Sequence, residues 1–258
     1  MQTNDEKLER ILLRQPFSNV QDDSHDARWQ QMQQAARILV AIEGGFAVLS
    51  DMMTNRSFIC ASDFGSIAGI ARQEMVIDSI FEDDIFRQVH PDDLLQKHAQ
   101  ELRFFNFIKP LPLSERSNYH TRCVLRFTDA QSGSVRTVLH RMSYHDHHAD
   151  GSIGIALCLY TPSYGDSPLV GINAQIANSS TGEIVSEAHF ARLDKQLLSR
   201  REVEILSRIA HGEGTKQIAE RLCISPNTVQ RHRQNIMQHL HVNNCAEAVH
   251  LATYMGLL

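Results

Sequence analysis

The chain has 258 residues, of which 42% are hydrophobic, and its formal net charge is −5. This length allows one large domain or two modest ones, and the composition is ordinary for a globular protein. The longest apolar run, Ile153–Tyr160, is too short to span a bilayer, and the polar first ten residues lack the layout of a signal peptide. We therefore expect a cytoplasmic protein that has no membrane partner.

The cysteines indicate neither disulfides nor a metal motif. They are five in number and widely spaced, each among apolar residues, and no two of them have only two residues between them as in a CxxC pair. An odd, scattered set is typical of reduced thiols in a protein core. We expect no cofactor and no metal site.

Residues 1–44 are expected to be helical towards their end. Trp29, Met32, Ala36 and Leu39 recur at helical spacing, and two glycines after position 43 end the pattern. Such an amphipathic helix either covers the domain to which it belongs or pairs with a second copy of itself. The sequence leaves both interpretations open.

Within residues 45–163 the pattern of apolar residues changes from the helical period to the two-residue period of β-strands. Two strands with a turn at Thr54–Asn55 are followed by short helical turns and by a longer helix that begins at Pro91, with acidic residues in its first turn. Three more strands follow, and the first of them alternates cleanly between apolar and polar residues. The predicted strands are Phe46–Met52, Arg56–Ser62, Tyr119–Phe127, Ser134–His145 and Ser152–Tyr160.

This order of elements resembles that of a PAS domain. The segment VHPDD at Val89–Asp93, ahead of a helix and three strands, is similar to the commonest local motif of that family. The resemblance implies a five-stranded antiparallel sheet with helices on one face, which encloses a small pocket. Such domains sense a ligand or mediate dimerisation; which residues line a ligand pocket here is unknown from the sequence.

A histidine-rich segment precedes the last of these strands. Imidazole and carboxylate groups bind transition metals, but alternate side chains of a strand point to opposite faces. We therefore interpret the segment as a solvated turn. Its members are His140, His145, Asp146, His147, His148 and Asp150.

The remaining chain divides into a linker and a more basic domain. Residues 164–195 are polar and rich in Gly, Ser and Asn, as is typical of a connector. From Gln196 onward seven Lys/Arg stand against five Glu, so residues 196–258 carry +2 and the rest carries −7. Residues 196–258, the more basic part, are therefore better suited to bind a polyanion than the rest of the chain is.

Residues 196–258 are predicted to form four helices. The second is short, and a tight turn at Cys223–Ser225 leads into the third, which begins at Pro226. On the third helix Val229, Ile236 and Leu240 mark a buried stripe, and the opposite face has no carboxylate. A short helix, a turn and a second helix with such a face fit a helix-turn-helix, in which the second helix enters the major groove.

This domain closely resembles the LuxR-type (GerE-like) DNA-binding domain. One departure is His239, because the family usually has lysine before this leucine, and the residues before it lack the pattern of acyl-homoserine-lactone sensors. The matching residues are Leu198, Arg201, Glu202, Ile205, Leu206, Gly212, Lys216, Ile218, Ala219, Leu222, Ser225, Thr228, Val229, His232, Ile236, Leu240 and Ala248.

Helix geometry and the resemblance together assign roles. Gln230, Arg231 and Gln234 point outward and are expected to contact bases, since Arg suits guanine and Gln suits adenine. Phosphate contacts are expected from Lys216, Ser225, Thr228, Arg233 and His232; a structural role for His232 fits equally well. On the last helix Ala246, Val249, Leu251 and Met255 are expected to be exposed, and Ala246, Val249 and Met255 to contact a second copy.

The fold class is therefore α+β, with a PAS-like sensor joined by a linker to an all-α four-helix domain. We expect the chain to regulate transcription as a homodimer that binds promoter DNA. A small molecule or a partner is expected to control it, and RNA polymerase is expected as a further partner. No catalytic residue is assigned, and the chain is not expected to be an enzyme. The alternative is a dimerisation scaffold whose helix-turn-helix is degenerate.

Overall fold

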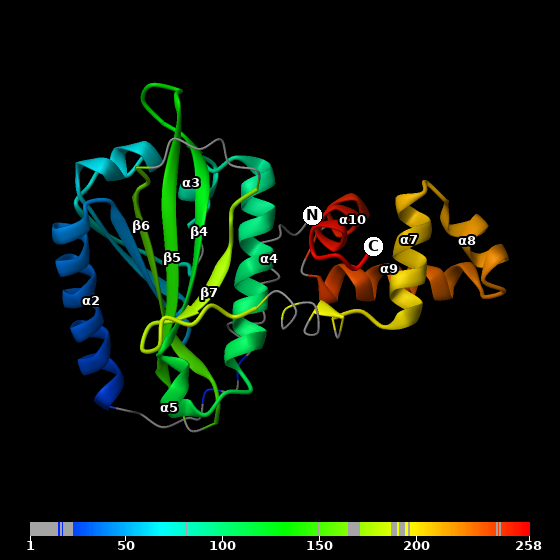
Figure 1. The fold of residues 1–258 in the computed structure, drawn as a ribbon, viewed down its shortest axis with the longest axis horizontal. Coiled ribbons are helices and arrows are strands. Elements are labelled where there is room, and N and C mark those ends of the chain that lie inside the picture. Colours follow the sequence, from blue (N-terminus) through cyan, green and yellow to red (C-terminus); the bar gives the residue numbers. More distant parts are fainter. Residues whose placement is uncertain are drawn as a thin grey trace. The chain divides into compact units, whose positions relative to one another are not determined.

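The computed structural model describes residues 15, 17, 23–80, 82–148, 150–164, 171–186, 190, 194–195, 197–240, 242 and 244–258. They belong to two compact units, one spanning Ile11–Val185 and one that includes Ser186–Leu258 (Figure 1). Among these residues, no helix combines the length and the apolar character that a bilayer span requires. Each unit is described below by itself.

An antiparallel sheet forms the core of the first unit. Its strands are β1 (Phe46–Asp51), β2 (Arg56–Ala61), β3 (Glu74–Ile77), β4 (Tyr119–Thr128), β5 (Val135–His147), β6 (Ile153–Pro162) and β7 (Gln175–Asn178). They lie in the order β3-β2-β1-β6-β5-β4-β7. The β1–β6 pairing, with Phe46 opposite Tyr160, joins the first hairpin to the three later strands. The expected α+β class is confirmed.

The sheet has seven strands where the sequence predicted five. The two additional strands are β3, which lies in a stretch expected to be helical, and β7, which lies in the stretch expected to be a linker. Each has only four residues, and β3 is exposed at every second position. Segments this short and polar give no readable alternation, so it is pairing with β2 and β4 that makes them strands.

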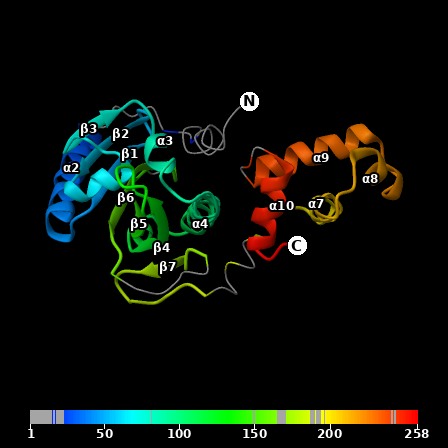
Figure 2. The same cartoon turned by 90° about the horizontal axis from the view of Figure 1, so that it is seen from above.

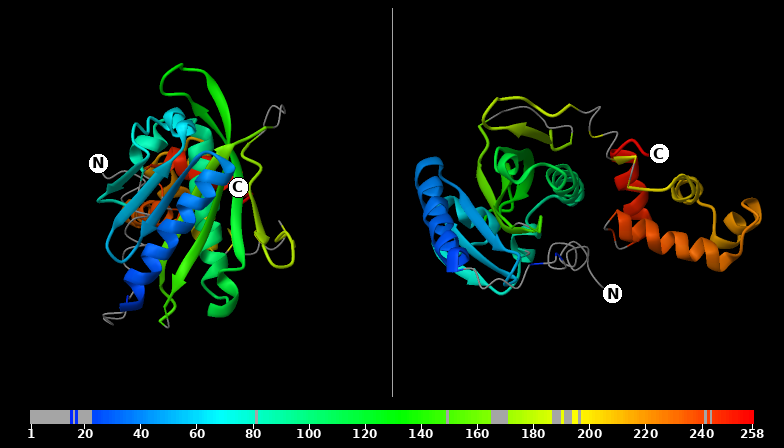
Figure 3. Two further views of the ribbon diagram at one scale, coloured as in Figure 1. Left: turned by 90° about the vertical axis from the view of Figure 1, so that its left-hand side faces the viewer. Right: turned by 90° about the horizontal axis from the view of Figure 1, so that it is seen from below.

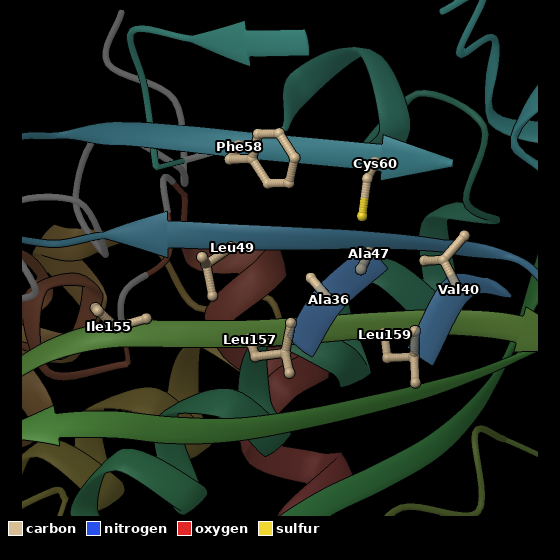
Figure 4. Close-up of a cluster of buried hydrophobic side chains, with 9 residues drawn as sticks. All are labelled: Ala36, Val40, Ala47, Leu49, Phe58, Cys60, Ile155, Leu157 and Leu159. Atoms are coloured by element: carbon tan, nitrogen blue, oxygen red, sulfur yellow. The ribbon is translucent and has the colours of Figure 1, made fainter. Parts of the chain in front are cut away.

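Helix α2 (Asp23–Glu43) covers one face of β2, β1 and β6. Figure 3 shows it lying along these strands, and Figure 4 shows Ala36 and Val40 directed at Leu157, Leu159 and Ala47. Trp29, Met32 and Leu39 pack against the same cluster. Within one copy of the chain, the helix therefore covers its own domain, which is the first of the two interpretations that its periodicity allowed.

The opposite face of the sheet is covered by α4 (Pro91–Ile108), as Figure 2 shows from above. The ring of Phe104 stacks on Tyr144 of β5 with centroids 5.1 Å apart, and Phe46 stacks on Tyr160 at 4.5 Å. Three short elements complete this layer, namely η1 (Asp63–Ala68), α3 (Asp83–Phe86) and α5 (Leu113–Arg116). The core is thus layered as helix, sheet and helices.

The start of α4 is bound to the sheet through the VHPDD segment. Pro91 occupies the first turn as predicted, and Nδ1 of His90 accepts from the backbone N–H of Asp92. Asp93 is 1% exposed and accepts from the backbone N–H of Arg126 at 2.8 Å and from its guanidinium at 2.5 Å. The second aspartate of the segment therefore joins α4 to β4.

The interpretation of the histidine-rich segment as a solvated turn is wrong. Strand β5 continues through His147, and Asp146 is buried at 6% exposure with a left-handed φ of 54°. The Asp146 carboxylate forms a hydrogen bond of 2.8 Å with Nδ1 of His25 and an ion pair with Arg28. Both partners lie on α2. Two polar partners from a distant helix let this charge lie inside the fold, which the local sequence does not reveal.

Helix α2 leaves part of its face of the sheet uncovered. A surface hollow of about 270 Å³ opens beside Leu39, over β4 to β6. Its polar lining includes His120 and Arg141, and Arg141 is ion-paired with Glu43 at the end of α2. The α2 side of the sheet therefore has an apolar cluster under α2 and a partly polar hollow beside it.

The second unit is helical. Its helices are α7 (Arg200–Ala210), α8 (Thr215–Arg221), α9 (Pro226–His239) and α10 (Cys245–Tyr254). The buried side chains that these helices share include Ile205, Ile218, Val229 and Ala248. These four segments lie where the sequence predicted them.

Candidate nucleic-acid interface

Local capping fixes where the helices of the second unit begin. Ser199 and Glu202 form a reciprocal capping box, in which the Glu202 N–H donates to Ser199 Oγ and the Ser199 N–H donates to the Glu202 carboxylate at 2.9 Å. Gly212, at a φ of 81°, ends the helix that follows. The next helix, α8, therefore starts three residues later in a new direction.

Four residues, Leu222 to Ser225, join α8 to α9. Cys223 adopts a left-handed φ of 52°, which reverses the chain without a glycine. Ser225 then caps α9, since its Oγ accepts from the Thr228 N–H at 3.1 Å, and Pro226 occupies the first turn. The Nη2 of Arg201 on α7 donates to the Leu222 carbonyl at 3.0 Å and secures the end of α8. The turn is thus held from both sides.

One side of α9 is fully buried. Val229 and Ile236 have no exposed surface, and Leu240 is 1% exposed, as the sequence predicted. These residues lie in the core formed with α7, α8 and α10. The rotation of α9 about its own axis is therefore set by apolar packing.

The opposite side of α9 is exposed and carries no carboxylate. Its exposed residues are Asn227, Gln230, Arg231, Gln234 and Gln238, as predicted. The side chains of Gln and Arg offer the donors and acceptors that match adenine and guanine edges. This surface can present several base-reading groups at once, and we call it the α9 face.

The residues predicted to contact phosphate flank this face with different exposure. Lys216 at the start of α8 is exposed, and Arg233 is half-buried. The Ser225 hydroxyl is already engaged with Thr228, whose Oγ1 lies 2.9 Å away. His232 is half-buried, and its Nδ1 is buried with no hydrogen-bond partner among the described residues. The packing of His232 accords with the structural role considered for it.

Two of the five glutamates of residues 196–258 pair with arginines of the same unit. Glu204 binds Arg201 at 2.7 Å and lies 3.7 Å from Arg208, and Glu213 lies 3.6 Å from Arg208. By contrast, no ion pair engages Lys216, Arg231 or Arg233 within the described part of the chain. These three cations, which lie on α8 and α9, are therefore available to a polyanion.

Glu202 and Arg201 matter structurally, and the sequence analysis gave them no role. Burial opposes ionisation of Glu202, but hydrogen bonds from Ser199 and the charge of His239 outweigh it and lower its pKa. The Ser-x-x-Glu spacing that opens α7 was the available signal for this residue. The contact from Arg201 to the Leu222 carbonyl joins residues 21 positions apart and had no such signal.

The last helix exposes fewer apolar residues than expected. Leu251 and Met255 are 2% and 5% exposed, because they pack into the core of their own unit. Ala246 is exposed and Val249 is half-buried. Of the three residues predicted to contact a second copy, only Ala246 is fully accessible in one copy of the chain.

The comparisons with known proteins agree on the second unit. Residues 196–252 match the model of the GerE family, described as bacterial regulatory proteins of the luxR family. The C-terminal unit therefore contains a LuxR-type helix-turn-helix domain, as its sequence resemblance predicted. The family that this model describes is one of regulatory proteins and not of enzymes.

Curated relatives are similar over the same part of the chain. The oxygen regulatory protein NreC of Staphylococcus carnosus is 46% identical over 63 residues, which are 24% of this chain and 29% of that protein. NreC of Staphylococcus aureus strain JH9 is 35% identical over 91 residues, or 34% of this chain and 42% of that one. The chain thus spans less than half the length of these relatives.

Solved structures align over more of the chain but only loosely. The Vibrio cholerae VqmA dimer in the absence of target DNA is 14% identical, with coverage of 89% and 88% and a TM-score of 0.28. Escherichia coli SdiA is 15% identical, with coverage of 89% and 90% and a TM-score of 0.24. At such scores these two likenesses support no statement about this chain.

Proposed function

We propose that this chain is a transcription regulator that binds specific DNA sequences as a dimer and is controlled through its first unit. The observation that carries the proposal is the α9 face. It combines Gln230, Arg231 and Gln234, all exposed, on a helix that follows a short helix and a tight turn. A helix of this kind fits the major groove and reads base edges there.

The distribution of charge supports DNA as the partner. Residues 196–258 carry +2 in a chain of net charge −5, and Glu204 and Glu213 of this unit pair with arginines away from α9. A charge of +2 gives weak non-specific attraction, so one copy alone would bind poorly. Two copies present two recognition helices to successive major grooves and add their contacts, which favours a dimer.

The first unit supports a separate sensing role. Its first hairpin and its last three long strands pair through β1 and β6, with helices packed on the face of Phe46 and Tyr160. This arrangement supports the sensing role that the PAS resemblance of the sequence implies. A signal bound there would act by favouring one arrangement of the dimer, since only differential affinity shifts a conformational equilibrium. RNA polymerase as a further partner stays a prediction.

The test is selection of DNA by the full chain from a random-sequence duplex library, followed by binding to the selected fragment. We expect one enriched, near-palindromic motif, and affinity that falls steeply between about 50 and 200 mM salt. A variant with Gln230, Arg231 and Gln234 all changed to Ala should enrich no motif. Arg200→Ala, on exposed surface of α7, is the matched control and should enrich the same motif as the wild type.

Two outcomes would contradict the proposal. If the wild type enriches no motif although the second unit is folded, the chain fits the scaffold alternative instead. If the triple variant enriches the same motif as the wild type, the α9 face does not read bases.

A further inference from the structure

A second group of chemically active side chains lies in the core of the first unit, between α4 and the sheet. It comprises Lys97 and Glu101 on α4, His140 on β5 and Cys158 on β6, all of them 8% exposed or less. Lys97 donates from Nζ to Glu101 Oε1 at 2.6 Å. The proposed DNA-binding function uses none of these groups.

Three of these side chains bring together ligand atoms of three kinds. A carboxylate oxygen of Glu101, a ring nitrogen of His140 and the Sγ of Cys158 all lie within 4.8 Å of one another. Zinc binds oxygen, nitrogen and sulfur at about 2.0 to 2.3 Å, so its ligand atoms lie roughly 3 to 4 Å apart. Side-chain movements of about 1 Å would therefore bring this trio to bonding distance.

The surroundings of His140 leave one of its ring nitrogens free to bind a metal ion. Its Nδ1 lies 3.6 Å from Cys123 Sγ, and its Nε2 is buried with no hydrogen-bond partner among the described residues. Burial and the nearby charge of Lys97 lower the pKa of His140 far below its ordinary value, so the ring is neutral. A proton on Nδ1 directed at Cys123 leaves Nε2 free, as is usual for an imidazole that ligates a metal.

Two neighbours of the trio, Lys97 and Tyr160, bear on its ability to hold a metal ion. Lys97 hydrogen-bonds the Glu101 carboxylate in the manner of an outer-shell partner that orients a ligand. The hydroxyl of Tyr160, whose ring centroid is 4.6 Å from that of His140, is also buried without a partner in the described part of the chain. Unsatisfied polar atoms inside a core cost free energy, and a bound water or ion is one way to satisfy them.

We propose that Glu101, His140 and Cys158 form a buried binding site for a divalent metal ion with borderline ligand preference, Zn²⁺ in the first place. Binding replaces the Cys158 S–H bond by a metal–thiolate bond and releases that proton to solvent. This site replaces the expectation that the chain holds no metal. Of the histidine-rich segment it uses only His140, which pairs with Tyr160 on the α4 side of the sheet, whereas His145 pairs with Ile155 on the α2 side.

The experiment uses the full chain without an affinity tag that binds metal. The protein is refolded with Co²⁺ in place of Zn²⁺, because cobalt reports thiolate ligation by a charge-transfer band in the near ultraviolet. We expect one Co²⁺ per chain and this band, together with a metal affinity that rises about tenfold per pH unit, as release of one proton requires. Added Zn²⁺ should remove the band by displacement.

Variants assign the ligands. Cys158→Ser and His140→Gln should each lower metal affinity by about 10-fold or more, and Cys158→Ser should abolish the band. Cys60→Ser is the matched control, because Cys60 is a buried thiol of the same sheet on the α2 side, and it should keep both signals. A variant with Ser at positions 145, 147 and 148 should keep them as well.

The cobalt spectrum of the wild-type protein tests the proposed metal site by itself, whether or not any variant folds. The absence of a cobalt band after refolding would overturn the proposal and leave buried water as the partner of His140 and Tyr160. A band that survives in folded Cys158→Ser, or one that disappears in the triple histidine variant, would overturn it equally. None of these outcomes bears on DNA binding, which is measured separately.

Discussion

The Nδ1 atom of His239, in the last turn of α9, lies 3.5 Å from a carboxylate oxygen of Glu202 in the first turn of α7. Glu202 is 4% exposed and also accepts from the backbone N–H of Ser199. One carboxylate therefore caps α7 and contacts the end of the helix that we propose to read DNA. His239 is also the position at which this sequence departs from its family, so the contact gives that histidine a role within the fold.

Glu202→Gln should destabilise the second unit at neutral pH by roughly 1 kcal/mol, since it weakens the capping box and removes the charge facing His239. The pKa of Glu202 is lowered below its ordinary value of 4.5. A lowered pKa contributes stability that is fully present above about pH 4.5 and is lost as pH falls through the value in the folded state. Hydrogen exchange of α7 and α9 peptides between pH 3 and 7 is the measurement, with rates corrected for intrinsic pH dependence.

The wild type should lose protection in these peptides on acidification, and Glu202→Gln should lose less. Equal losses in the two proteins would mean that Glu202 contributes nothing to the acid sensitivity of this unit.

Arg231→Ala should lower discrimination among DNA sequences more than it lowers affinity for random DNA. A base contact of this kind is worth about 1 to 3 kcal/mol. Lys216→Ala should instead weaken binding to all sequences alike and reduce the salt slope by about one. Titrations of selected and random duplexes at several salt concentrations separate the two effects. If Arg231→Ala excludes random competitor as well as the wild type does, then Arg231 is not a base contact.

Asp93→Ala should destabilise the first unit by about 2 kcal/mol, because it removes hydrogen bonds to the charged Arg126 that join α4 to β4. Arg126 is one-third exposed and can reach water, which keeps the cost below that of a fully buried pair. Urea unfolding followed by the fluorescence of Trp29, the single tryptophan, measures this. Asp78→Ala, which breaks an exposed pair with Arg56, should change stability by less than about 0.5 kcal/mol.

The proposed dimer can be tested at Ala246, which is exposed on α10. Ala246→Glu and Ala246→Arg should both reduce protection of the second half-site on the selected DNA, because each places a charge in the proposed contact. Simple attraction to or repulsion from DNA would instead make the two variants differ in sign. Ala246→Ser preserves size and neutrality and should behave as the wild type does. Light scattering should show the full chain as a dimer without DNA; a monomer that protects a single half-site would contradict the model.

The sequence by itself determined where the helices of the second unit lie and which side of α9 is buried. Its helices are short and amphipathic, and their ends are marked by local chemistry, as at Ser199, Gly212 and Ser225. The outward direction of Arg231 followed from helical period and the buried stripe of Val229 and Ile236. All of these signals act within a few residues along the chain, which is why they can be read before the fold is known.

Only the tertiary structure decided what depends on partners distant in sequence. The segments β3 and β7 are strands because they pair with β2 and β4. Asp146 can be buried because the folded chain places His25 and Arg28 of α2 next to its carboxylate. Likewise, Glu101, His140 and Cys158 are separated by 39 and 18 positions along the chain but share one space in the core. No periodicity carries that information, since side chains from three elements meet only when the helix packs on the sheet.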